Sequence, residues 1–294
     1  MGKYWNSNYI ERDDTLKYCK NDIALKPKHR SQARLLLGKM YYKIKRYLWW
    51  WFSGNQLSKT NTNSNTNANR YLYATHQSPL IRSLKDVDMY LQYNKIKNLE
   101  LAVQKINHVV INPGEIFSFW KLVGKPTKRK GYLDGMILFC GAVKPGIGGG
   151  LCQLTNLIYW MALHTPLTVI ERYRHSFDVF PDSNRTQPFG SGATCIYNYR
   201  DLMIKNETNH PFELILEVTE TDLVGSFRSN VAPSFHYDVY EKNHRMDQEY
   251  WGGYSRHNSL YRKVYDIEGV EVADEFIIDN HALMMYQPFI EMQV

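Results

Sequence analysis

The sequence predicts an α+β protein, in which a helix-containing central domain surrounds a Gly-rich loop and a β-rich part follows it. Two observations carry this prediction: apolar residues recur at helical spacing through the first half, and short runs of mixed apolar and polar residues follow Pro188. The 294 residues are 44% hydrophobic, which is enough for a large core. We expect four segments: a basic amphipathic segment at 1–54, a polar linker at 55–70, a core domain at 71–206 and a β-rich extension at 207–294.

The basic charge of the chain is concentrated in its N-terminal segment. Residues 1–60 carry 13 Lys and Arg against 4 Asp and Glu, a net charge of +9, whereas the remaining residues carry 23 against 25, a net charge of −2. Residues 31–52 are predicted to be an amphipathic helix, with an apolar stripe of Leu37, Met40, Tyr41, Ile44, Leu48 and Trp51. This pattern fits either a helix on an anionic membrane surface or a helix docked on the main domain. No nucleic-acid-binding motif accompanies the positive charge, so no nucleic-acid partner is expected.

The sequence favours a cytoplasmic location, peripheral on the membrane. No apolar stretch typical of a secretory signal follows Met1. The longest apolar run, residues 47–52, is far shorter than the roughly 20 residues that cross a bilayer. The polar stretch NQLSKTNTNSNTNANR that follows is too poor in apolar residues to build a core and is predicted to be a linker.

In the central part, helical periodicity predicts a helix over residues 86–109, before the turn sequence Asn-Pro-Gly at 112–114. A second helix begins directly after the Gly-rich loop and ends before Pro166, with Leu151, Leu154, Leu157, Ile158 and Met161 on one face. Short strands are expected at 115–120, 136–139 and 168–171.

The C-terminal part is predicted to be mostly strands. The expected strands are 194–199, 202–205, 212–219, 235–240 and 261–265. Glu268-Gly269 lies between two such runs, which predicts a hairpin that pairs residues 261–265 with residues 270–277.

The segment Pro145–Tyr159 places Cys152 after three glycines at a helix start. Amide groups and the dipole at such a start favour an anion, so the thiol should ionise readily. The predicted ligand-binding residues are Gly146, Gly148, Gly149, Gly150 and Gln153. The alternative is that the glycines allow close backbone packing and that the cysteine is an ordinary buried residue.

Other familiar sites do not fit this loop. It lacks the dinucleotide-binding G-x-G-x-x-G pattern and the Gly-Lys-Ser/Thr of a nucleotide P-loop, so no cofactor is expected. Cys152, His164 and His175 are conceivable metal ligands, but their spacing matches no zinc pattern, so no metal is expected. Glu115 and Asp134 are candidates for a carboxylate pair.

Four segments of the chain resemble the VanW-like family. They are NPGEIFSFWKLVG at 112–124, GYLDGM at 131–136, PGIGGGLCQLTNLIYWMALHTPLTVIER at 145–172 and DLMIKN at 201–206. The resemblance covers roughly residues 71–220 and implies a cell-envelope role, with a cell-wall precursor or other envelope ligand as partner. It implies no settled reaction.

The family pattern includes Cys152-Gln153 and a histidine after Glu-Arg, here His175, which makes Cys152 and His175 the candidate catalytic residues. A cysteine and a histidine are the minimum for thiol catalysis, and a third polar group usually orients the ring. Many relatives carry Asp-Ala-Thr where this chain has Gly192-Ala193-Thr194, so Asp178, Asp182 or Asp201 would have to replace that acid.

Two functions follow from this reading. The first is an accessory or ligand-binding role linked to peptidoglycan or glycopeptide resistance. The second is a cysteine-dependent enzyme that acts on an amide or peptide of a cell-wall precursor. An exposed thiol beside His175 would favour the enzyme, whereas a thiol buried against Leu154 and Leu157 would favour the binding protein.

Overall fold

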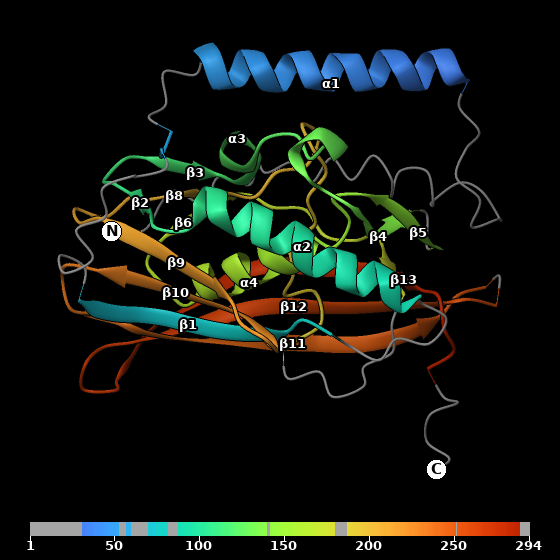
Figure 1. Ribbon diagram of the computed structural model, residues 1–294. Helices are drawn as coiled ribbons and strands as arrows, with labels where there is room; N and C mark the ends of the chain where they lie inside the picture. Colours follow the sequence, from blue (N-terminus) through green and yellow to red (C-terminus); the bar gives the residue numbers. More distant parts are fainter. Residues whose placement is uncertain are drawn as a thin grey trace.

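A computed structural model describes residues 31–52, 57–59, 70–81, 88–139, 142–179, 187–250 and 252–288. It confirms the α+β class (Figure 1). The helices are α1 (Gln32–Phe52), α2 (Met89–Ile106), α3 (Phe119–Val123), the 3-10 helix η1 (Lys128–Lys130) and α4 (Cys152–Leu163). No helix within the described ranges is both long enough and apolar enough to cross a membrane.

The first sheet joins residues from both ends of the central region. Its strands lie in the order β1 (Tyr71–Pro79), β10 (Asp222–Ser229), β9 (Phe212–Val218) and β2 (Val109–Ile111). All three pairings are antiparallel. The strands β1 and β10 were not predicted from the sequence, and both mix small and polar residues with apolar ones. Because β9 and β10 pair with β1 and β2, residues 212–229 belong to the same sheet as residues 71–79.

The second sheet contains the predicted C-terminal hairpin. Its order is β11 (His236–Gln248), β12 (Tyr254–Tyr265), β13 (Glu271–Met284) and β7 (Phe177–Asp178). The hairpin is confirmed, since Tyr261 pairs with Phe276 and Tyr265 pairs with Glu271. Gly269 takes a φ of 80° in its turn, a conformation that glycine adopts without strain. The strands β12 and β13 are both longer than the predicted ranges 261–265 and 270–277.

Two small sheets complete the fold. One has the order β3 (Ile116–Ser118), β8 (Met203–Lys205) and β6 (Thr168–Glu171), and the other pairs β4 (Asp134–Phe139) with β5 (Ala142–Ile147). The prediction of a strand at 194–199 is wrong. Residues 196–200 instead form a turn closed by one bridge between Ile196 and Arg200, in which Asn198 takes a φ of 57°.

The helix α4 lies at the centre of the molecule. The predicted face of Leu154, Leu157, Ile158 and Met161 is buried, but Thr155 and Tyr159 on the other side are buried as well. The helix packs on β1, β10 and β6. At its C-terminal end, Arg262 of β12 donates to the carbonyl oxygens of Leu163 and Thr165 at 3.1 and 2.9 Å. These contacts anchor the C-terminal end of α4 to β12.

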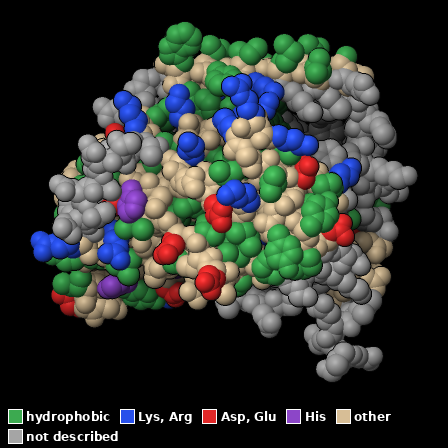
Figure 2. Space-filling view, in the orientation of Figure 1, with side chains coloured by type: hydrophobic (Ala, Val, Ile, Leu, Met, Phe, Trp, Pro, Cys, Tyr) green, Lys and Arg blue, Asp and Glu red, His purple; other side chains and the backbone are tan. Residues whose placement is uncertain are grey.

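The N-terminal helix α1 docks on the domain with a face that carries Arg46 and the aromatic side chains of Tyr42 and Trp50. The Arg46 guanidinium donates to both carboxylate oxygens of Glu171, at 2.7 and 2.5 Å, and the hydroxyls of Tyr47 and Tyr197 lie 3.0 Å apart. The predicted apolar stripe points away from the domain: Leu37, Met40, Tyr41, Ile44, Leu48 and Trp51 are all exposed. Figure 2 shows hydrophobic side chains along the edge of the molecule where α1 lies in Figure 1. Most of the predicted linker 55–70 lies outside the described residues.

Candidate functional site

The glycines of the central loop allow close packing. A Cβ on Gly149 would lie 2.2 Å from the carbonyl group of Gly135, and a Cβ on Gly150 would lie 2.2 Å from Lys95 Cγ. Gly146 and Gly148 have similarly close neighbours in Ile137 and Pro126. Only a residue without a side chain fits in such spaces. This is the packing role that the sequence analysis left as an alternative.

The loop also uses some of its own polar groups. The Gly148 N–H donates to the carbonyl oxygen of Leu133, and the Gly149 N–H donates to that of Gly146. The buried amide of Asn98 donates to Gly149 O at 3.0 Å and accepts from Leu133 N at 2.8 Å. Two of the loop N–H groups are therefore committed within the protein, and ligand binding by these glycines stays a prediction.

Gln153 connects α4 to the end of β1. Its side-chain amide donates to Ser78 Oγ at 3.0 Å and to Pro79 O at 2.9 Å. These bonds hold the amide in a structural position. A ligand would have to compete with both acceptors, so the ligand-binding role of Gln153 also stays a prediction.

The structure brings Cys152 and His175 together. Cys152 is the first residue of α4, and His175 lies in the segment between β6 and β7. A hydrogen bond with Cys195 lowers the pKa of the Cys152 thiol, and a hydrogen bond with His175 and its charge lower it further, against the opposing effect of burial. The net result is a pKa well below the usual thiol value, which is the condition for a thiolate nucleophile. Whether the pair is catalytic stays a prediction.

Three aspartates were considered as replacements for the acidic residue that many relatives carry at position 192. Two of them make other contacts, and the third is not described. Asp178 lies 3.5 Å from the Arg256 guanidinium and accepts from the Tyr286 hydroxyl at 2.9 Å. Asp201 accepts from Ser118 Oγ at 2.6 Å. Asp182 lies outside the described residues.

The structure gives a reason for glycine at position 192. A Cβ there would lie 2.7 Å from Asn156 Oδ1, which itself accepts from Ala193 N at 2.7 Å. An aspartate at this position would displace the Asn156 side chain, so the local packing of this chain suits glycine.

His164 is remote from the thiol. It follows α4 at the opposite end from Cys152, about 18 Å away at the 1.5 Å rise of an α-helix. Burial lowers the pKa of His164, and its Nδ1 lies 2.9 Å from Trp160 O. His164 therefore cannot join Cys152 and His175 around one metal ion. The two candidate carboxylates, Glu115 and Asp134, lie in different elements. Glu115 accepts a hydrogen bond from Asn112 N between β2 and β3, whereas Asp134 is the first residue of β4.

Sequence reasoning missed Cys195, whose Sγ lies 3.8 Å from Cys152 Sγ. Both cysteines are free thiols. Cys195 is 8% exposed, and burial together with the neighbouring Cys152 raises the pKa of its thiol well above the usual value. Because 43 residues separate the two cysteines, no spacing rule could have paired them.

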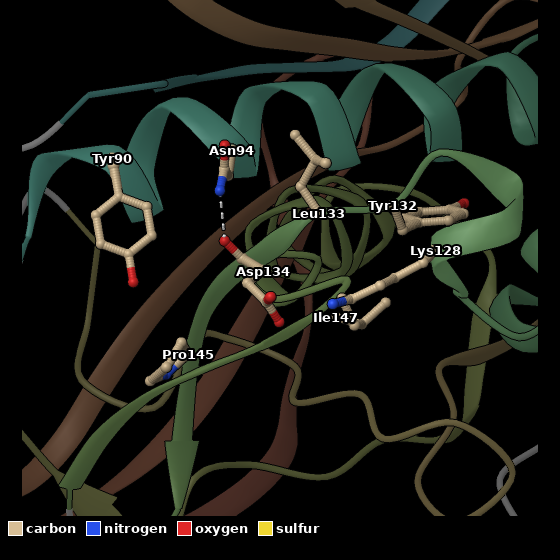
Figure 3. A pocket seen from close by; sticks show the side chains of 8 residues that line it. All are labelled: Tyr90, Asn94, Lys128, Tyr132, Leu133, Asp134, Pro145 and Ile147. Atoms are coloured by element: carbon tan, nitrogen blue, oxygen red, sulfur yellow. Dashed lines mark hydrogen bonds between the residues drawn. The ribbon is translucent and has the colours of Figure 1, made fainter.

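A pocket of about 480 Å³ lies beside the glycine loop (Figure 3). Its lining residues are Tyr90, Asn94, Lys128, Tyr132, Leu133, Asp134, Pro145 and Ile147. The side-chain amide of Asn94 donates to Asp134 O at 2.8 Å and so ties α2 to the start of β4. Two phenols, an ammonium group and a carboxylate border an apolar wall, an arrangement suited to a ligand with both apolar and charged parts. Of these residues, only Asp134 was singled out from the sequence.

Comparison with known proteins finds a matching family model and curated relatives. Residues 94–228 match the model of the family described as VanW like protein. The vancomycin B-type resistance protein VanW of Enterococcus faecalis is 36% identical over 152 residues, which are 52% of this chain and 55% of that protein. The uncharacterized protein YoaR of Bacillus subtilis is 28% identical over 159 residues, which are 49% of this chain and 51% of that protein.

The chain thus spans about half the length of the curated relatives that it matches. No solved structure matches it. The matched residues include the glycine loop, α4, Cys152, His175 and Cys195. By these comparisons, residues 94–228 of the chain are similar to the VanW-like family.

Proposed function

We propose that this protein is an accessory protein of the cell envelope that binds a cell-wall precursor or a related envelope ligand, with a link to glycopeptide resistance. The name of the Enterococcus relative supports the link with resistance. The single observation that carries the binding role is the pocket beside the glycine loop, because it combines charged, aromatic and apolar groups in one cavity.

The pocket matches the chemistry of peptidoglycan fragments. Their stem peptides carry carboxylates and methyl groups, and their amino sugars present apolar faces. The exposed Lys128 ammonium can pair with a carboxylate, and Tyr90, which is half exposed, can pack against a sugar ring or a methyl group. Asp134 can accept from an amide or an ammonium group.

Calorimetric titration with a soluble disaccharide pentapeptide tests the binding role. Lys128→Ala should weaken binding about tenfold, the effect of losing about 1.4 kcal/mol of one charged contact. Arg129→Ala is the matched control, because Arg129 lies on the same 3-10 helix, is exposed and does not line the pocket. Equal effects of the two substitutions, or no detectable binding by the unaltered chain, would contradict the proposal.

A second function, the cysteine-dependent enzyme, is favoured by the lowered pKa of Cys152 beside His175. In that reaction the Cys152 thiolate adds to an amide carbonyl, His175 gives a proton to the departing amine, and water then hydrolyses the thioester. Incubation of the chain with the same disaccharide pentapeptide, followed by mass spectrometry, tests it. Cys152→Ser should abolish cleavage and His175→Ala should slow it about 10²–10⁴-fold, whereas persistence of cleavage in Cys152→Ser would exclude this mechanism.

We also propose that α1 places the protein on an anionic membrane surface. Its docked face holds it to the domain through Arg46, so the outward stripe is available to bury apolar area in a bilayer, and exposed Lys43 and Lys45 add electrostatic attraction. Trp51 and Phe52 are 80% and 70% exposed and stack on each other. Attachment from the cytoplasmic side stays a prediction.

Sedimentation with phosphatidylglycerol vesicles tests this attachment. Replacing both Trp51 and Phe52 by Ser should reduce capture, and added salt should reduce it further, because charge attraction is screened over about 10 Å at 0.1 M. Tyr250→Ser is the matched control, since Tyr250 is 78% exposed but lies outside α1. Capture of the double variant equal to that of the unaltered chain would mean that the stripe does not bind lipid.

A further inference from the structure

The thiols of Cys152 and Cys195 are held close together by the surrounding structure. Thr155 Oγ1 donates to Ala193 O at 2.6 Å, and Ala193 N donates to Asn156 Oδ1 at 2.7 Å. Both bonds join the first turns of α4 to the segment that leads into Cys195. These bonds hold the two segments together, and the two sulfur atoms lie 3.8 Å apart.

A third element brings His175 to this pair. Thr194 N donates to Tyr173 O at 2.7 Å, which attaches the segment before Cys195 to the stretch that carries His175. The His175 imidazole hydrogen bonds to Cys152, whereas Thr155 hydrogen bonds to Cys195. Three segments that are distant in the sequence thus converge on two sulfur atoms.

The two thiols are chemically unequal. The pKa of Cys152 is lowered by the Cys195 hydrogen bond and by His175, and the pKa of Cys195 is raised by burial and by Cys152. Cys152 is also the more exposed residue, half-buried where Cys195 is buried. One half-buried thiolate beside one buried thiol of raised pKa is an arrangement in which the first sulfur can attack and the second can resolve the product.

We propose that Cys152 and Cys195 form a dithiol–disulfide couple that exchanges with the disulfide of a protein or a small thiol. The Cys152 thiolate attacks one sulfur of that disulfide, whose S–S bond breaks and releases a thiolate that takes up a proton. Cys195 then loses its proton, and its sulfur attacks Cys152 Sγ and releases the second substrate thiol. The pair loses two electrons, and the substrate disulfide gains two.

The geometry meets the main requirement of the second step. A disulfide has an S–S bond of about 2.05 Å, so the sulfurs must approach from 3.8 Å to bonding distance. Cys195 lies outside the helices and strands, so its side chain can move toward the fixed end of α4. This activity does not depend on the proposed ligand-binding function, because it needs neither the pocket nor a cell-wall ligand.

Incubation of the full chain with glutathione disulfide tests the couple. The products are trapped by acid and N-ethylmaleimide and mapped by mass spectrometry of peptides. The expected product is an internal disulfide between Cys152 and Cys195 that dithiothreitol reverses. In Cys195→Ser, the reaction should stop at a glutathione adduct on Cys152, and that adduct should persist at least about tenfold longer than in the unaltered chain.

Matched controls and a second measurement make the test decisive. Replacing Cys19 and Cys140 by Ser should leave the internal disulfide unchanged. At pH 7 the unaltered, reduced chain should be alkylated at Cys152 at least about tenfold faster than at Cys195. Each unit of difference between the two pKa values changes the ratio of their thiolate fractions about tenfold. The proposal is overturned if both cysteines of the unaltered chain stay reduced, if Cys152 keeps its glutathione without forming the internal disulfide, or if the two thiols alkylate equally.

The outcome is separable from that of the cysteine enzyme. Cys195→Ser removes the couple but retains Cys152 and His175. Amide cleavage would therefore survive Cys195→Ser, whereas disulfide exchange would not go to completion.

Discussion

The ion pair between Arg46 and Glu171 should be a large contributor to stability, because it joins α1 to the central domain away from solvent. The two side chains are only 11% and 20% exposed, and the guanidinium donates to both carboxylate oxygens. Glu171 also accepts from Asp201 N at 3.0 Å, which fixes the carboxylate in place. Removal of Arg46 would leave that carboxylate partly buried and without its cation.

The expected cost of Arg46→Met follows from this geometry. A hydrogen bond to a charged group contributes about 1.5–3 kcal/mol, and removing one partner of a buried pair costs about 3–5 kcal/mol. Glu171 is 20% exposed and regains some hydration, so we expect a loss of about 2–4 kcal/mol in the free energy of unfolding. The pKa of Asp201 should also rise in this variant, because Arg46 lowers it.

Urea unfolding followed by circular dichroism measures this loss. The double-mutant cycle with Glu171→Gln isolates the interaction between the two side chains. Lys43→Met is the matched control, since Lys43 is an exposed cation on the same helix and should cost less than about 0.5 kcal/mol. A cost for Arg46→Met no larger than for Lys43→Met, or a coupling near zero, would refute the reasoning.

Three further predictions concern the rest of the fold. Burial raises the pKa of Asp201 to about 7, so the stability that its neutral form provides is complete below about pH 3.9 and is lost as the pH rises through 7. Urea unfolding across this range should show the decline, at most about 1.4 kcal/mol per pH unit, and Asp201→Asn should flatten it. Gly149→Ala should destabilise by about 3 kcal/mol or more, because the new methyl meets a main-chain carbonyl, whereas Gly38→Ala, with open space around it, should stabilise by about 0.5–1 kcal/mol; equal melting temperatures would contradict this contrast. Deletion of residues 1–60 should destabilise at least as much as Arg46→Met, and an unchanged urea midpoint would show that α1 is not docked in solution.

Local sequence patterns were enough to predict several elements. The apolar stripe of α1, the glycine-to-helix transition at Cys152 and the turn at Gly269 each depend on residues within a few positions of one another. Periodicity and turn chemistry act over that range. The same patterns failed at 194–199, where alternation suggested a strand, because the pairing of a strand depends on a distant partner that this segment does not have over its length.

The sequence by itself determined the α+β class, the VanW-like resemblance and the pair of candidate residues Cys152 and His175. Only the tertiary structure decided that Cys195 lies beside Cys152, that α1 turns its apolar stripe outward, and that the glycines pack against β4 and α2. The physical reason is that these features depend on contacts between segments tens to more than a hundred residues apart. Such contacts are set by how the elements pack around α4, and no local pattern of residues encodes them.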